Sequence, residues 1–185
     1  MTRTLFTALL ALLLALPAAA GTLAGVTLPD KVDAHGHSLV LNGMGLRTKL
    51  FIKVYVGGLY LPQKEKSAQK VLAADAPRQM QMSFIYDVSK DQMCDAWEEG
   101  LTDNTPNAPA EVKANFKTLC GWMDGVGKGQ KLALTYIPGE GTHVDLAGKE
   151  KGTLPGKATA DAILSSWIGR DPAPGKDFKQ AVLGQ

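Results

Sequence analysis

The feature that most constrains the fold is an apolar run at residues 50–61, Leu-Phe-Ile-Lys-Val-Tyr-Val-Gly-Gly-Leu-Tyr-Leu. It is rich in β-branched and aromatic residues, which favour strands, and it is too long and too apolar for a strand that faces water. We therefore predict a central strand of a sheet. The pair Gly57-Gly58 inside it indicates a bulge, or a place where another backbone or a ligand comes close.

An Asn-Gly pair upstream of this run predicts a turn. The segment Leu39-Val40-Leu41 meets Asn42-Gly43, a dipeptide that favours a type I′ hairpin because both of its residues accept positive φ. We therefore predict a hairpin turn at residues 42–43. Short edge strands are expected before it, at residues 26–28 and 32–35.

The rest of the chain alternates between strand-like and helix-like segments. Further strands are predicted at residues 79–86, 131–137, 142–146 and 149–154. In the first of these, one face is expected in the core and carries Met80, Met82, Phe84 and Tyr86. Helices are predicted at 67–74, after Ser89, after Pro109, at 159–168 and near 177–183. This order indicates the α+β class with an antiparallel sheet.

The two cysteines, Cys94 and Cys120, fall on the two helices that start near Ser89 and Pro109. Cys94 comes early in the first helix and Cys120 late in the second, so antiparallel packing would bring them to the same level. In an oxidising compartment two cysteines usually pair, and we predict a disulfide. Two buried thiols packed as small apolar groups are the alternative.

The N-terminus has the three regions of a secretory signal. Arg3 is followed by an apolar run and then by the small residues Pro-Ala-Ala-Ala-Gly at 17–21. The apolar run is about 12 residues long, which is short for a membrane-spanning helix, so no stable span is expected after cleavage. We predict that residues 1–20 are a cleaved signal peptide and that residues 21–185 form one domain, which is periplasmic or secreted.

The charge balance excludes some classes of partner. The formal net charge of +2 includes Arg3, and no basic run interleaves with aromatic residues, so no nucleic-acid partner is expected. Asp33, His35 and His37 alternate along a possible strand, but three such residues alone are a weak signal for a metal site. We predict no metal and no cofactor.

Three segments together resemble the chalcone isomerase-like family, in particular its exported bacterial members. The first and most specific is Asn42-Gly-Met-Gly-Leu-Arg-Thr-Lys-Leu-Phe-Ile-Lys-Val-Tyr-Val-Gly-Gly-Leu-Tyr-Leu61. The others are Phe84 to Trp97 and the stretch from Gly152 through Ser165-Ser-Trp-Ile-Gly169 to Gly184. The resemblance implies an open-faced sandwich, in which a large antiparallel sheet is covered on one face by helices with a cleft between them.

The plant isomerases of this family close a chalcone to a flavanone, and the resemblance places their site residues on this chain. Arg47 matches the arginine that holds the anion, Tyr86 falls within one position of the tyrosine, and Ser166 takes a position that carries serine or threonine. Tyr55 stands in place of the catalytic threonine and Gln92 in place of an asparagine. If the chain is an isomerase, Arg47 and Tyr86 are its expected catalytic residues.

The family also contains non-catalytic fatty-acid-binding proteins, in which the same arginine and a tyrosine bind a carboxylate. We therefore expect a cleft that binds a fatty-acid-like or other amphiphilic carboxylate. Its expected ligand contacts are Arg47, Tyr55, Tyr86, Gln92 and Ser166, and side chains such as Met80, Met82 and Phe84 would take the tail. An intramolecular lyase is the second hypothesis. The third is a structural or protein-interaction module whose own side chains fill the cleft.

Overall fold

The computed structural model describes residues 21–185, and the predicted signal peptide at 1–20 lies outside the described residues. One seven-stranded antiparallel sheet dominates this part, and each of its strands pairs with the next along the chain. A separate hairpin of β1 (Gly21–Leu23) and β2 (Val26–Leu28) precedes it. The sheet strands are β3 (Lys31–Ala34), β4 (His37–Lys49), β5 (Ile52–Leu61), β6 (Arg78–Phe84), β7 (Lys131–Ile137), β8 (Gly141–Leu146) and β9 (Lys149–Leu154).

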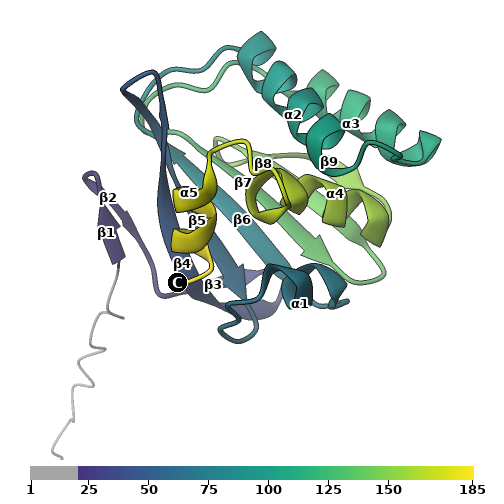
Figure 1. Ribbon diagram of the computed structural model, residues 1–185, viewed down its shortest axis with the longest axis horizontal. Coiled ribbons are helices and arrows are strands. Elements are labelled where there is room, and N and C mark those ends of the chain that lie inside the picture. The colour runs from purple at the N-terminus through teal and green to yellow at the C-terminus, as the bar shows by residue number, and fades with distance from the viewer. Residues whose placement is uncertain (1–20) are drawn as a thin grey trace, which may run out of the picture.

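The helices lie across one face of this sheet (Figure 1). They are α1 (Ala68–Ala73), α2 (Lys90–Asn104), α3 (Ala110–Trp122), α4 (Lys157–Ile168) and α5 (Lys176–Val182). The fourth helix contacts each of the others and is the centre of the layer. Within residues 21–185, no helix has the length and apolar character needed to cross a membrane. The predicted α+β fold, a large antiparallel sheet with helices on one face, is confirmed.

The main core lies between the sheet and these helices. Strand pairing places Tyr55 opposite Phe84 and Met82 opposite Leu132, so these side chains form rows on the helix-covered face. Each of them is buried. The prediction that Met80, Met82 and Phe84 face the core is therefore confirmed, whereas β6 ends at Phe84 and Tyr86 lies in the bend that follows.

The opposite face of the sheet is also partly covered. Leu28, at the end of β2, packs so close to Gly58 that a Cβ there would lie 2.5 Å from its Cδ1. Tyr60 donates a hydrogen bond from its hydroxyl to the Pro29 carbonyl at 3.0 Å. The rings of His35 and His143 stack with centroids 3.8 Å apart, which joins the β3–β4 turn to β8. The sheet is therefore curled, and its outer strands approach each other on this face.

The predicted hairpin turn at Asn42-Gly43 is wrong, because β4 continues through both residues. The Asn42 side chain donates to the Val182 carbonyl at 2.9 Å and accepts from the Glu65 backbone N–H at 2.8 Å. A Cβ at Gly43 would collide with the backbone of α5. Strand β4 has a register shift between residues 41 and 43. Asn42 and Gly43 therefore lie at a bulge, where α5 packs against β4.

The actual turn between β4 and β5 consists of Leu50 and Phe51, with φ of 47° and 69°. The predicted central strand is β5, which starts at Ile52, after this turn. The expected close approach at its glycine pair is confirmed, because a Cβ at Gly57 would lie 2.5 Å from Cζ of Phe178 on α5. Pairing between β5 and β6 shows no register shift there, so the glycines do not form a bulge.

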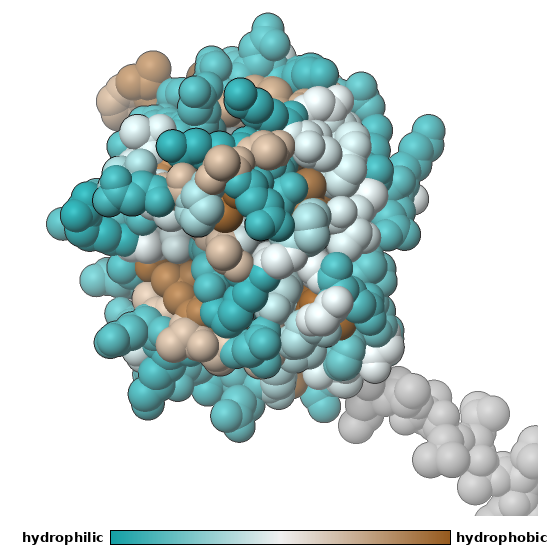
Figure 2. Space-filling model, turned by 90° about the vertical axis from the view of Figure 1, so that its right-hand side faces the viewer, coloured by the Kyte–Doolittle hydropathy of each residue, from teal (hydrophilic) through white to brown (hydrophobic). Residues whose placement is uncertain are grey.

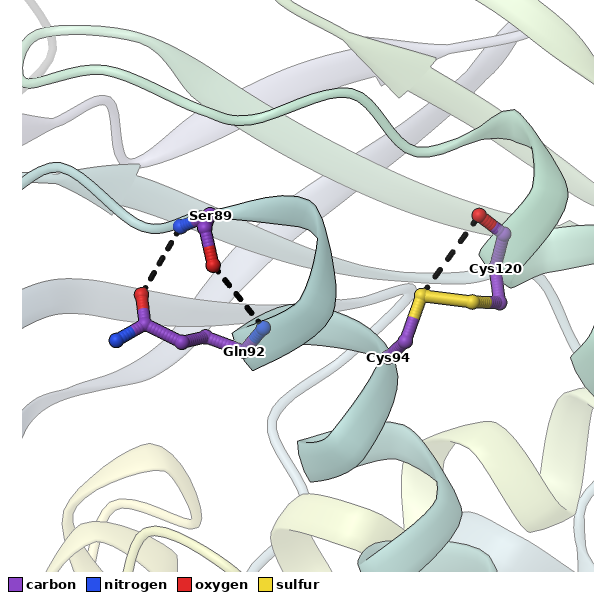
Figure 3. Close-up of a disulfide and its surroundings, with 4 residues drawn as sticks. All are labelled: Ser89, Gln92, Cys94 and Cys120. Carbon is purple, nitrogen blue, oxygen red and sulfur yellow. Dashed lines mark hydrogen bonds between the residues drawn. A yellow bond between two sulfur atoms is a disulfide. The ribbon is translucent and has the colours of Figure 1, made fainter.

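The predicted helix pair and disulfide are confirmed. Helix α2 begins with a capping box in which the Ser89 hydroxyl accepts from the Gln92 N–H and the Gln92 side chain accepts from the Ser89 N–H (Figure 3). Cys94 and Cys120 are joined, with their Cα atoms 5.3 Å apart. The bond fixes α2 against α3, and α2 forms one wall of the cavity described next.

Candidate functional site

A cavity of about 280 Å³ lies between the sheet and the helices α2 and α4. Its lining is mostly apolar, with a few polar and charged side chains among the apolar ones. The buried lining includes Tyr55, Met82, Phe84, Met93, Leu132, Ile163, Ser166 and Trp167, and the exposed lining includes Lys49, Leu50, Ile52, Tyr86, Asp87 and Gln92. The cleft is therefore open, which contradicts the hypothesis that the protein's own side chains fill it.

All five residues predicted as ligand contacts line this one cavity: Arg47, Tyr55, Tyr86, Gln92 and Ser166. They come from β4, β5, the loop after β6, α2 and α4, so folding brings together positions that are far apart in the sequence. Their juxtaposition is a fact of the structure, while their roles in binding stay predictions. Met80, expected beside Met82 in the cleft, lines instead a separate small pocket next to Arg78.

Tyr55 forms part of the floor of the cavity. Only 7% of its surface is exposed, and its ring packs against Phe84 and edge-on to Phe178. Its hydroxyl oxygen accepts a hydrogen bond from Trp167 Nε1 at 2.8 Å. Burial raises the pKa of Tyr55, and the charge of Arg47 and the Trp167 hydrogen bond oppose that rise in part. The phenol therefore keeps its proton at neutral pH and has it available to donate.

Arg47 is the cross-strand neighbour of Tyr55 in the β4–β5 pair. Its side chain is half-buried, and among residues 21–185 it forms no hydrogen bond and no ion pair. Arg78, which is fully buried, is different: it is paired with Asp161 and donates to the Val71 carbonyl. A guanidinium that lines an apolar cavity without a partner can take a bidentate anion such as a carboxylate.

The mouth of the cavity is formed by Tyr86 and Gln92, among others. Tyr86 is 50% exposed, and its backbone N–H donates to the Val54 carbonyl at 3.2 Å. Gln92 is exposed, and its Oε1 already serves the capping box of α2. The amide Nε2 of Gln92 makes no hydrogen bond within the described chain and is free to donate to a ligand.

Helix α4 supplies the opposite wall with Ser166 and Trp167. The Ser166 hydroxyl lies against Gly100 of α2, where a Cβ would collide with it, so a glycine at position 100 allows the two helices this close. The indole N–H of Trp167 donates the hydrogen bond that holds the Tyr55 hydroxyl. The two residues are 112 positions apart, and nothing in the sequence pattern signals that bond.

The described residues give no support to the weak metal signal at residues 33–37. Between Gly21 and Gln185, no three His, Cys, Asp or Glu side chains are placed to hold a metal ion. His35 stacks on His143, and His143 in turn contacts Glu140 at 3.0 Å and Glu150 at 3.2 Å. The His35–His143 stack joins the β3–β4 turn to β8, while the two glutamates come from the turn before β8 and from the neighbouring strand β9.

Comparison with known proteins agrees with this fold. No curated protein sequence matches the chain. Among solved structures, a fatty-acid binding protein of Arabidopsis thaliana has the same fold, with a TM-score of 0.71 and 17% sequence identity over 89% of this chain and 96% of that one. The family model described as chalcone isomerase-like matches residues 20–184. The chain therefore belongs to the chalcone isomerase-like family.

Proposed function

We propose that the protein is a non-catalytic binding protein for an amphiphilic carboxylate, such as a fatty acid, which it holds in the cavity between sheet and helices. The observation that carries the proposal is Arg47, a half-buried guanidinium that lies beside a largely apolar cavity and has no partner among residues 21–185. We further propose that the protein acts outside the inner membrane. The leader-like N-terminus and the disulfide support that location.

The polar end of the cavity suits a carboxylate. Arg47 offers paired N–H donors that match the two oxygens of the anion, and the protonated hydroxyl of Tyr55 offers a third. Trp167 fixes the position of that hydroxyl, so little side-chain freedom is lost when the ligand binds. A hydrogen bond to a charged group contributes about 1.5–3 kcal/mol.

The apolar part suits a hydrocarbon tail of moderate length. Met82, Phe84 and Met93 line it, and methionine adapts to irregular ligands. A volume of about 280 Å³ is at the lower end for small-molecule sites. Medium-chain carboxylates should therefore bind better than long-chain ones. The Arabidopsis neighbour, a fatty-acid binding protein of the same fold, adds support for this ligand class.

The isomerase hypothesis receives less support from the cavity. The position of the catalytic threonine in the plant enzymes is occupied by Tyr55, whose ring fills part of the cavity floor and whose hydroxyl is held by Trp167. We expect naringenin chalcone to cyclise at its spontaneous rate in the presence of the protein. A rate above that background, lost in Arg47→Gln, would restore the enzyme hypothesis.

The experiment is isothermal titration of octanoate, decanoate and palmitate into wild type, Arg47→Gln and Arg170→Gln. Arg170 is the matched control, because it is an exposed arginine that pairs with Asp171 and does not line the cavity. We expect Arg47→Gln to bind about 10- to 150-fold more weakly and Arg170→Gln to bind like wild type. Equal affinities for all three proteins would contradict the proposal.

A further inference from the structure

The turn between β4 and β5 is apolar, exposed and strained. Leu50 is 82% exposed and Phe51 is 99% exposed, and both have positive φ. A two-residue turn of this kind normally carries Asn-Gly, because bulky side chains are disfavoured in the left-handed region. Here the strained positions carry two large apolar side chains that are mostly exposed. An outlier of this kind is a reason to ask what contacts the turn.

The exposed apolar side chains of the described chain gather at this end of the sheet. Leu50, Phe51, Ile52 and Tyr86 are all the large hydrophobic side chains that are exposed within residues 21–185, and together we call them the apolar tip. Tyr86 lies at the same end of the sheet, because its backbone N–H donates to the carbonyl of Val54, near the start of β5. The hairpin end protrudes at the upper left of Figure 1. Most of the face in Figure 2 is hydrophilic or neutral, with apolar atoms in small patches.

Basic side chains flank the apolar tip. Lys49 precedes the turn and Lys53 follows it, both are exposed, and neither is within ion-pair distance of an acidic side chain among residues 21–185. Asp87 is the acidic residue at the cavity mouth, and its carboxylate accepts the backbone N–H of Lys128, a third exposed lysine. The surroundings of the tip are therefore net positive.

We propose that the apolar tip docks onto an anionic lipid surface. A protruding apolar apex with lysines behind it can insert between headgroups while the ammonium groups meet lipid phosphates. The apolar tip, with four side chains, is too small for a typical protein interface, which needs about 800 Å² on each partner. A bilayer requires no such area and no complementary shape.

The docking would also place the cavity mouth at the membrane. Leu50, Ile52 and Tyr86 belong both to the apolar tip and to the cavity lining. An amphiphile could then pass between bilayer and cavity without crossing water. This consequence rests on the proposed function, whereas the docking itself rests only on the tip and its lysines.

The test is co-sedimentation of the chain from residue 21 onward, which contains the whole described core, with vesicles and without added carboxylate. The vesicles are pure phosphatidylcholine, or phosphatidylcholine mixed equally with phosphatidylglycerol. The main variant is Leu50→Asn with Phe51→Gly, which installs the preferred turn dipeptide and should fold at least as well as wild type. We expect wild type to bind the anionic vesicles and this variant to bind them at least tenfold more weakly.

Two lysine variants test the charge contribution. Lys49→Gln with Lys53→Gln should weaken binding to the anionic vesicles. Lys64→Gln with Lys66→Gln, with the same change of charge just beyond the far end of β5, should bind like wild type. Failure of wild type to sediment, or equal binding by the turn variant, would overturn the docking. So would a dimer dispersed by the turn variant, which would assign the tip to a second copy. None of these results bears on the carboxylate titration, so the two proposals fail separately.

Discussion

Removal of the Cys94–Cys120 disulfide should destabilise the protein by an amount that follows from the loop it closes. The cysteines are 26 positions apart. The chain-entropy relation for a loop of that length gives about 3.5 kcal/mol at 25 °C. For a domain of this size, that loss lowers the melting temperature by roughly 7–14 °C.

The assay is urea unfolding of wild type and of the double variant Cys94→Ala with Cys120→Ala, each with and without reductant. Reductant should lower the free energy of unfolding of wild type to the level of the double variant and leave the double variant unchanged. Because the bond fixes α2, which carries Met93 and Trp97 into the cavity wall, the double variant should also bind decanoate more weakly. An oxidised wild type no more stable than the double variant would refute the reasoning.

Three further predictions follow from single side chains. Tyr55→Phe leaves the buried N–H of Trp167 without its acceptor and should cost about 1–3 kcal/mol in urea unfolding, while Trp167→Phe combined with it should cost less than the two changes summed. Asn42→Ala removes the hydrogen bonds that tie β4 to Val182 of α5 and to Glu65, and should cost about 1–3 kcal/mol, seen as a lower melting temperature. Burial raises the pKa of Tyr60 and of Tyr136 to about 12, so the stability they confer is complete below pH 10 and is lost as pH rises from 10 to about 12. Phenolate absorbance and the unfolded fraction should rise together between pH 10 and about 12. The same phenolate titration curve for the folded and for the fully unfolded protein would contradict this prediction.

The order of strands and helices could be predicted because it depends on local periodicity and capping. Ser89 and the apolar spacing after it marked α2, and the positions of the two cysteines on antiparallel helices were enough to pair them. The turn predicted at Asn42-Gly43 is wrong because contacts with distant residues, and not local preference, decide the structure there. Its local preference is overridden by partners at positions 65 and 182, and contacts that distant leave no pattern in the neighbouring sequence.

In the site, too, some features could be predicted from the sequence and others could not. Arg47 and Tyr55 lie on adjacent strands, and the family resemblance placed both at the cavity. The hydrogen bond from Trp167, by contrast, depends on how α4 crosses the sheet. The turn at Leu50-Phe51 could not be foreseen either, since two bulky residues at positive φ contradict the usual turn preferences.

The most direct test of the central claim is a crystal structure of the protein with a medium-chain carboxylate that carries a bromine at its tail end. We predict carboxylate oxygens within hydrogen-bond distance of the Arg47 guanidinium and the Tyr55 hydroxyl, with the bromine signal among the apolar side chains that line the cavity. A carboxylate held at the mouth by Lys49, with Arg47 unengaged, or a cavity that stays empty at saturating ligand, would contradict the account.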